Sequence, residues 1–186
     1  MSKKAVVILT EGFEDMEAVV PIDIMTRAGI EVTIASPGEG PVRAAYGTTI
    51  MPTTTIDRVT DLYDAIVFPG GGRNAQSLAA DRRVVDIARR HYGAGELVAA
   101  ICASSGCVLA EAAEILKGKR ATGDPGFNDK LAAGGAIITD ELVTIDGNII
   151  TGMGPGAAML FGLQIAEYLC GKEAAEVLAR RWRVER

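Results

Sequence analysis

The stretch AVVILTEGFEDMEAVVPIDIMTRAGIEVTIAS, residues 5–36, decides the fold class. An unbroken apolar run lies between Lys4 and Thr10, as in a strand that is buried on both faces. From Glu14 to Ala28 the apolar residues recur at helical spacing, and the pattern ends at Gly29. A second strand pattern covers Ile30 to Ala35. The stretch therefore predicts one β-α-β unit with parallel strands.

The rest of the chain continues this alternation of apolar strands and amphipathic helices. Further strands are predicted at Ala65–Phe68, Leu97–Ile101, Ile137–Thr139, Leu142–Ile145 and Ile149–Thr151, with short antiparallel strands or a hairpin within 41–56. Arg120–Thr122 is predicted to be a short strand or a loop. Further helices are predicted at Asn74–Tyr92 with a break near Asp81, at Ser104–Leu116, from 154 to Leu169, and at Lys172–Trp182. The order predicts an α/β fold with an open, mostly parallel sheet, helices on both faces and a few antiparallel additions.

Length and composition bound the class of protein. The 186 residues fit a single domain over 1–186, and 48% hydrophobic with 23% charged residues is typical of a soluble globular chain. The net charge of −5 shows no excess of basic residues of the kind that binds nucleic acid. No apolar run is long enough to span a membrane, and the N-terminus lacks a signal-peptide cleavage site. We therefore expect a cytoplasmic protein without specific nucleic-acid or membrane binding.

Cysteine and histidine usage argues against disulfides and metal sites. Three cysteines without paired spacing form no disulfide framework, and Cys170, next to Gly171 at a helix end, is expected to be packed. The single histidine, His91, ends a polar helix, where it is expected to complement the helix dipole. With no second histidine and no Cys-x-x-Cys pair, no metal site is expected.

Cys102 is the strongest candidate for a reactive side chain. In LVAAICASSG, residues 97–106, a buried strand ends at Cys102, and small residues then open a helix. This arrangement is typical of a nucleophile elbow, and the helix amides would favour a thiolate there. A buried structural cysteine is an equally good interpretation of the pattern alone.

Two neighbouring segments follow strands that end at the same edge of the sheet. The glycines in Pro69–Gly72 lack the spacing of a P-loop or a dinucleotide site, so bare amides at Gly71 and Ala103 are candidates for an oxyanion hole. A tight turn without a ligand is the alternative. Glu17, at the start of the first helix, is a candidate partner of Cys102, although Glu14 and Asp15 complement the helix dipole equally well.

Four stretches together resemble the ThiJ/PfpI superfamily, also called the DJ-one family, and its small ThiJ/YajL-type branch. They are residues 5–36, YDAIVFPGGGRNAQ at 63–76, LVAAICASSGCVLAEA at 97–112 and GPGAAMLFGLQIAEYLCGKEAA at 154–175. The resemblance implies a flavodoxin-like three-layer sandwich, a homodimer and no cofactor. It implies that Cys102 and Glu17 are catalytic, and that Gly70, Gly71, Ala103, Arg27 and Asp124 surround the substrate. Arg27 would line an anion-friendly site, often near the dimer interface.

Departures from the family pattern refine these expectations. Asp124 stands where the animal-type branch carries histidine, which lowers the expected glyoxalase turnover and would raise the pKa of a neighbouring thiolate. Ala103, where peptidase-like members carry histidine, argues against protease activity. Met153 replaces an arginine that often precedes Gly-Pro-Gly, so one anion contact is missing.

The resemblance implies stress protection by action on reactive 2-oxoaldehydes or their protein adducts, in the manner of a glyoxalase or deglycase. The partners would then be a small reactive carbonyl substrate or a modified protein. The alternative is a redox sensor or chaperone that works through oxidation of Cys102 to a sulfinate. A second alternative is an isocyanide-hydratase-like enzyme, which Glu17 disfavours because the acidic partner there is typically an aspartate.

Overall fold

A seven-stranded sheet forms the middle layer of the computed structural model, which describes residues 2–184. The strand order is β10-β11-β7-β6-β1-β2-β5, and every neighbouring pair is parallel except β10 and β11. The strands are β1 (Lys4–Ile8), β2 (Glu31–Ser36), β5 (Thr54–Thr55), β6 (Ala65–Phe68), β7 (Leu97–Ile101), β10 (Val143–Asp146) and β11 (Ile149–Gly152). The long parallel strands follow the 2-1-3-4-5 order, which confirms the flavodoxin-like sandwich.

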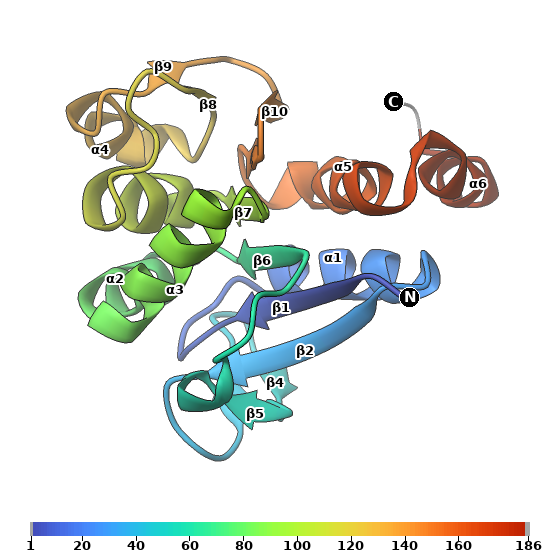
Figure 1. Cartoon of the computed structure of the whole chain (residues 1–186), viewed down its shortest axis with the longest axis horizontal. Helices are drawn as coiled ribbons and strands as arrows, with labels where there is room; N and C mark the ends of the chain where they lie inside the picture. Colours follow the sequence, from blue (N-terminus) through green and yellow to red (C-terminus); the bar gives the residue numbers. More distant parts are fainter. Residues whose placement is uncertain (1, 185–186) are drawn as a thin grey trace.

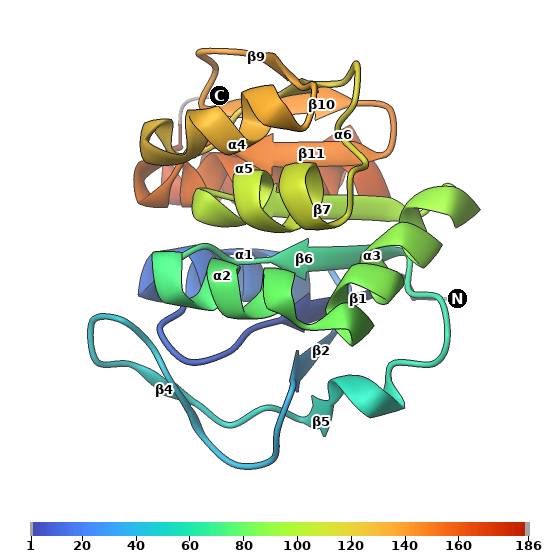
Figure 2. The same ribbon diagram turned by 90° about the vertical axis from the view of Figure 1, so that its left-hand side faces the viewer.

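Helices cover both faces of this sheet (Figures 1 and 2). One face carries α1 (Asp15–Arg27), α5 (Ala158–Cys170) and α6 (Lys172–Trp182). The other carries α2 (Gly72–Ala80), α3 (Arg82–Ala94), η2 (Ser105–Ala112) and α4 (Asn128–Ala133). Short 3-10 turns lie at η1 (Ile56–Arg58), η3 (Pro125–Phe127) and η4 (Pro155–Ala157). None of the helices within residues 2–184 has the length and hydropathy that crossing a bilayer requires.

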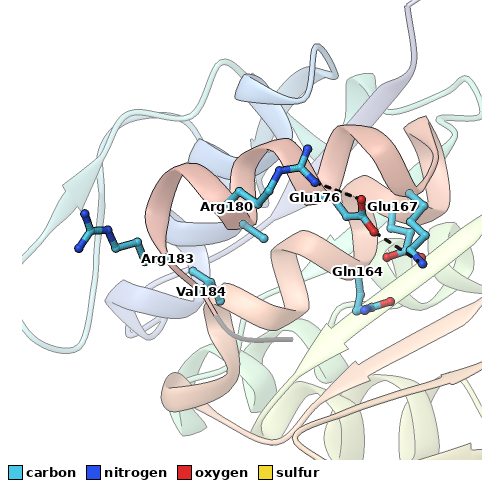
Figure 3. A pocket seen from close by; sticks show the side chains of 8 residues that line it. Gln164, Glu167, Glu176, Arg180, Arg183 and Val184 are labelled. Carbon is cyan, nitrogen blue, oxygen red and sulfur yellow. Dashed lines mark hydrogen bonds and ion pairs between the residues drawn. The ribbon is translucent and has the colours of Figure 1, made fainter.

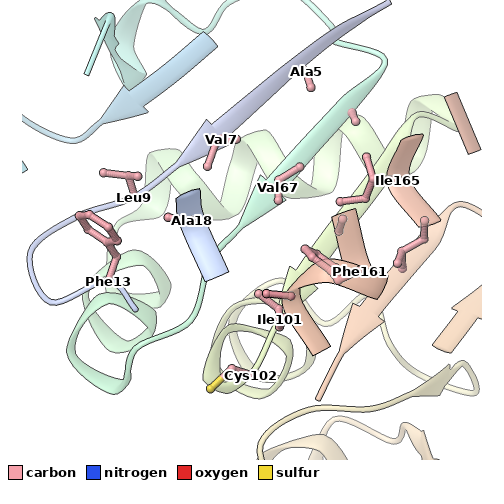
Figure 4. Packing of buried hydrophobic residues seen from close by; sticks show 14 of the residues in the cluster. Ala5, Val7, Leu9, Phe13, Ala18, Val67, Ile101, Cys102, Phe161 and Ile165 are labelled. Carbon is pink, nitrogen blue, oxygen red and sulfur yellow. The ribbon is translucent and has the colours of Figure 1, made fainter. Parts of the chain in front are cut away.

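Alternate residues of each central strand enter two separate cores. Val7 packs in the cluster beneath α1 and α5, whereas its neighbours Val6 and Ile8 pack in the cluster on the other face. Figure 4 shows the first cluster, with Phe161 of α5 beside Ile101 of β7 and Cys102 at its margin. Burial on both faces explains why the central strands have unbroken apolar sequences.

Most predicted elements are present, and the differences are local. The predicted break at Asp81 separates α2 from α3, where the Asp81 side chain caps Arg83 N at 3.0 Å. The helix after Cys102 ends at Ala112 rather than Leu116, because η2 has π-helical turns and Glu114 adopts a positive φ of 56°. The expected hairpin is β3 (Val42–Arg43) with β4 (Thr49–Ile50), whereas β8 (Arg120–Ala121) and β9 (Ile137–Ile138) form a separate parallel pair.

The expectations for Cys170 and His91 were wrong. Cys170 is exposed rather than packed, because the last turn of α5 ends at the surface. His91 is fully buried and does not act as a charged partner of the helix dipole. Its Nε2 accepts a hydrogen bond from Tyr63 N at 3.1 Å, and its Nδ1 lies 2.8 Å from the Ile87 carbonyl oxygen. These contacts require a neutral ring with its proton on Nδ1.

Acid is therefore expected to destabilise the fold through His91. Burial lowers the pKa of His91 below its ordinary 6.5, so below that pH the unfolded chain binds a proton that the folded ring resists. The loss of unfolding free energy is at most about 1.4 kcal/mol per pH unit. Urea unfolding of the wild type and His91→Gln at pH 7.5 and 5.5 measures it. The variant should lose less stability on acidification, and an equal loss in both proteins would contradict the assignment.

Candidate active site

Cys102 stands on a strained turn at the carboxyl end of β7. Its φ is +60°, a conformation that residues with a side chain rarely adopt. Two hydrogen bonds hold the turn, from Cys102 N to the Gly152 carbonyl oxygen at 2.8 Å and from Ser105 N to the Cys102 carbonyl oxygen at 3.2 Å. The side chain is 7% exposed, and in Figure 4 its sulfur points away from the labelled apolar residues. The elbow geometry expected at this position is present.

Two backbone amides face the sulfur. The N–H groups of Ala103 and Gly71 act on the Cys102 sulfur and lower the pKa of its thiol. Gly71 has a φ of +88°, and a Cβ there would collide with the Gly12 carbonyl oxygen. A glycine is therefore needed to bring this amide to the sulfur. Both amides that the sequence suggests for an oxyanion hole therefore act on the thiol.

Glu17 is the buried acid of the site. Its side chain has no exposed surface, and Oε2 accepts a hydrogen bond from Gly70 N at 2.8 Å. Its other oxygen, Oε1, is buried and has no conventional hydrogen-bond partner. Glu14 takes the capping role instead, because its Oε2 accepts from Glu17 N at 2.8 Å. The structure thus separates two acids that the sequence left equivalent.

Burial raises the pKa of Glu17 to about 7. The hydrogen bonds from the Cys102 side chain and from Gly70 N oppose this shift, whereas the charges of Glu14 and Asp124 add to it. At neutral pH the carboxyl group therefore exists in both its protonated and ionised forms. An acid with such a pKa is suited to giving and taking protons near pH 7.

The thiol does not have the low pKa expected from the helix amides alone. Burial and the charge of Glu17 raise the pKa of Cys102 above its ordinary value, and they outweigh the amides of Ala103 and Gly71. The two groups are close enough for each to shift the pKa of the other. A thiolate is therefore best stabilised when Glu17 carries the proton, and the pair titrates as a unit.

Asp124 borders the same thiol from another segment. The thiol donates to Asp124 Oδ2 at 3.6 Å, and Oδ1 accepts from Gly126 N at 2.7 Å. The second contact caps the turn η3 and holds the carboxylate beside the sulfur. No imidazole takes part here, because the chain's only histidine, His91, is buried in the contacts with Tyr63 and Ile87.

Within a single copy of the chain, Arg27 lies away from these residues. It occupies the last turn of α1, ten positions or roughly 15 Å along the helix from Glu17. Its Nε donates to both oxygens of Asp23 at 2.9 and 3.0 Å, and its guanidinium lies 5.4 Å from the Trp182 ring. The positive charge is engaged at the junction of α1 and α6, so it does not line the Cys102 site.

Sequence reasoning missed two side chains that hold the site together. Asn74 is fully buried, donates to the carbonyl oxygens of Pro69 at 2.8 Å and Gly70 at 3.1 Å, and accepts from Thr10 N at 2.7 Å. Ser104 Oγ also donates to the Pro69 carbonyl oxygen, at 2.6 Å. The one available signal was an amide side chain in the first turn after a glycine-rich loop, where carbonyl groups need donors.

A larger hollow lies elsewhere on the surface. Figure 3 shows it between α5 and α6, with a volume of about 770 Å³. Its walls include Gln164, Glu167, Glu176, Arg180, Arg183 and Val184. None of these residues belongs to the Cys102 site, and none carries a nucleophile. The site around the sulfur is the better candidate for chemistry, although Cys102 is only 7% exposed.

Comparison with known proteins identifies the family. The family model described as the DJ-1/PfpI family matches residues 3–168. The chain belongs to the DJ-1/PfpI family. The match includes every residue of the Cys102 site and confirms the resemblance inferred from the four sequence stretches.

Relatives within the DJ-1/PfpI family match this chain along nearly its whole length. Protein dj-1beta of Drosophila melanogaster is 38% identical over 182 residues, covering 97% of this chain and 96% of the relative. A Caenorhabditis elegans protein named glutathione-independent glyoxalase DJR-1.2 is 32% identical over 180 residues, covering 96% and 95%.

Solved structures from the DJ-1/PfpI family confirm the fold. The crystal structure of Drosophila melanogaster DJ-1beta superposes with a TM-score of 0.95 and covers 100% of both chains. A structure described as Toxoplasma gondii DJ-1, oxidized, has a TM-score of 0.93 at 32% identity and also covers 100% of both chains.

Proposed function

We propose that this chain is a stress-protective, cofactor-independent enzyme that acts on reactive 2-oxoaldehydes or their protein adducts. The observation that carries the proposal is the buried pair of Glu17, with a pKa raised to about 7, and Cys102 on its strained turn. A nucleophile beside an acid that exchanges protons at neutral pH is what an internal proton transfer on a carbonyl compound requires. The name of the glyoxalase relative from Caenorhabditis elegans favours the same reaction class.

The reaction follows from the positions of these groups. The sulfur of Cys102 attacks the aldehyde carbon, and the resulting oxygen is held by the amides of Gly71 and Ala103 and takes up the thiol proton as a hemithioacetal. Glu17 then removes the hydrogen from the sulfur-bearing carbon and returns a proton to the neighbouring carbon. The product is a thioester of a 2-hydroxy acid. Water cleaves its C–S bond, which releases the acid and regenerates the thiol without any external oxidant or reductant.

The proposal includes a homodimer in the cytoplasm. Exposed apolar side chains on α1 and in the segment after β4, such as Met16 at 50%, Val19 at 43% and Met51 at 65% exposure, support a second copy of the chain as the partner. The cytoplasmic location remains a prediction from the sequence.

Lactate formation from methylglyoxal by freshly reduced protein tests the proposed function. Cys102→Ser should reduce the rate to that of the buffer, because the sulfur forms the covalent bond to the substrate. The matched control is Cys170→Ser, which removes an exposed thiol outside the site and should leave the rate unchanged. Equal rates for the wild type and Cys102→Ser would overturn the proposal.

A redox role for the same thiol is the second candidate. The unpartnered Oε1 of Glu17 favours it, because a protonated Glu17 could donate a hydrogen bond to an oxygen of a Cys102 sulfinate. Intact-mass measurement after mild peroxide treatment tests this role. Addition of two oxygen atoms to the wild type, but not to Cys102→Ser, would support it, and unmodified wild type would exclude it.

A further inference from the structure

The charged groups with the largest effects on the candidate site are acidic. Glu14 and Asp124 are the charges that act most strongly on Glu17, and Glu17 is the one that acts most strongly on Cys102. Among the ion pairs within residues 2–184, none includes Glu14, Glu17 or Asp124. Arg27, the cation expected from the family resemblance, is held by Asp23. The site therefore has negative groups and no cation paired with them.

Asp124 lies beside the sulfur that an incoming molecule must reach. Its Oδ2 is 3.6 Å from the sulfur, and its Oδ1 is fixed by Gly126 N at 2.7 Å, so the carboxylate cannot easily turn away. Asp124 is half-buried, whereas Glu17 is fully buried. Because only 7% of Cys102 is exposed, a ligand that reaches the sulfur comes close to Asp124.

A fixed charge at this place discriminates between ligands by their charge. A unit charge about 5 Å away changes the local concentration of a singly charged ligand about fourfold, even when the interaction is screened by the dielectric constant of bulk water. The factor by which a cation is enriched multiplies the factor by which an anion is depleted. The rate at which a cationic ligand reacts with the sulfur should therefore exceed that of an anionic ligand by more than about tenfold. Partial burial strengthens the effect and weakens its screening by salt.

We propose that Asp124 is a specificity-determining residue that admits neutral and positively charged carbonyl compounds to Cys102 and excludes those that carry a carboxylate. The inference rests on the proposed function in taking Cys102 as the reacting group. The preferred substrate class is a small neutral 2-oxoaldehyde, or a carbonyl adduct next to an ammonium or guanidinium group.

Two thiol reagents of similar size and opposite charge test the proposal without any turnover. They are 2-(trimethylammonio)ethyl methanethiosulfonate, a cation, and 2-sulfonatoethyl methanethiosulfonate, an anion. In each, the thiolate attacks the reagent's sulfenyl sulfur, a disulfide forms and methanesulfinate leaves. A Cys170→Ser background removes the exposed competing thiol, and Cys107 is buried. The ratio of the two rate constants cancels the thiolate fraction of each variant, so it reports charge selection alone.

The cation-to-anion ratio should fall about tenfold in Asp124→Asn and be largely kept in Asp124→Glu. Glu39→Gln, which removes an exposed charge away from the site, should leave it unchanged. An equal ratio in the wild-type background and Asp124→Asn would overturn the inference. That result would not affect the proposed function, which is tested by lactate formation. Lactate formation that does not need Cys102 would overturn the proposed function but would not change the cation-to-anion ratio. The two failures are therefore distinguishable.

Discussion

Gly70→Ala is expected to disable the site and to destabilise the protein by about 2–3 kcal/mol. A Cβ at this position would collide with Glu17 Oε2, lie 2.6 Å from the Cys102 Cβ and lie 2.9 Å from the Ile101 carbonyl oxygen. The backbone of Gly70 is not in the left-handed region, so alanine itself is tolerated and the close approach is the only obstacle. Relief of the overlap must move Glu17 or the strained turn at Cys102. Lactate formation should fall at least tenfold, and urea unfolding measures the loss of stability.

Gly72→Ala is the matched control for this prediction. Its added Cβ would meet only Phe127 Cζ at 3.8 Å, which is ordinary contact, and Gly72 begins helix α2. Alanine there should leave lactate formation unchanged and raise stability by up to about 1 kcal/mol. Equal activity in Gly70→Ala and Gly72→Ala would mean that Glu17 and Cys102 need not be so close.

Glu17→Gln is expected to remove the contribution of Glu17 to the pH dependence of the free energy of unfolding. Because burial raises the pKa of Glu17 from 4.5 to about 7, the folded chain holds a proton that the unfolded chain releases. This contribution is complete below pH 4.5 and is lost as the pH rises to about 7, which amounts to about 3 kcal/mol. Glutamine stays neutral throughout. The free energy of unfolding of the variant, relative to the wild type, should therefore rise by up to that amount between pH 4.5 and 8.

Urea unfolding at several pH values in this range measures the difference, and the contribution of His91 cancels because both proteins retain it. Glu39→Gln is the control, because it removes an exposed carboxylate that makes none of the site's contacts described above. A difference between Glu17→Gln and wild type that does not change with pH would show that Glu17 is ionised over the whole range. Such a result would remove the proton donor from the proposed mechanism.

The fold was predictable from the sequence because its signal lies in the central strands. β6 and β7 have the predicted bounds, since strands buried on both faces leave continuous apolar runs that end at glycine, proline or cysteine. The carboxyl ends of parallel strands share one edge, so the segments holding Glu17, Gly70 and Cys102 were expected to meet. Short elements were harder, as with α4, whose only fully buried residue is Leu131.

The electrostatics of the site could not be predicted in the same way. The spacing of Glu14 and Glu17 fits either acid, and only tertiary contacts assign one to the helix cap and the other to Gly70 N. Helix amides at Cys102 suggested a low thiol pKa, but burial and Glu17 outweigh them. The family resemblance implied that Arg27 lines the site, whereas within one copy of the chain the Arg27 side chain is paired with Asp23, four residues earlier. Each of these outcomes depends on burial or on a competing partner, which sequence spacing does not encode.

The most direct test of the central claim compares two reactions of Glu17→Gln. Lactate formation should fall at least about a hundredfold, because Glu17 is the group assigned to move the proton between the two carbons. Alkylation of Cys102 by iodoacetamide at pH 7.5, in a Cys170→Ser background, should stay equal or become faster, because the loss of the Glu17 charge lowers the pKa of the thiol. Wild-type lactate formation in Glu17→Gln, or a parallel loss of alkylation and lactate formation, would contradict the assignment of Glu17 as the proton-transfer partner of Cys102.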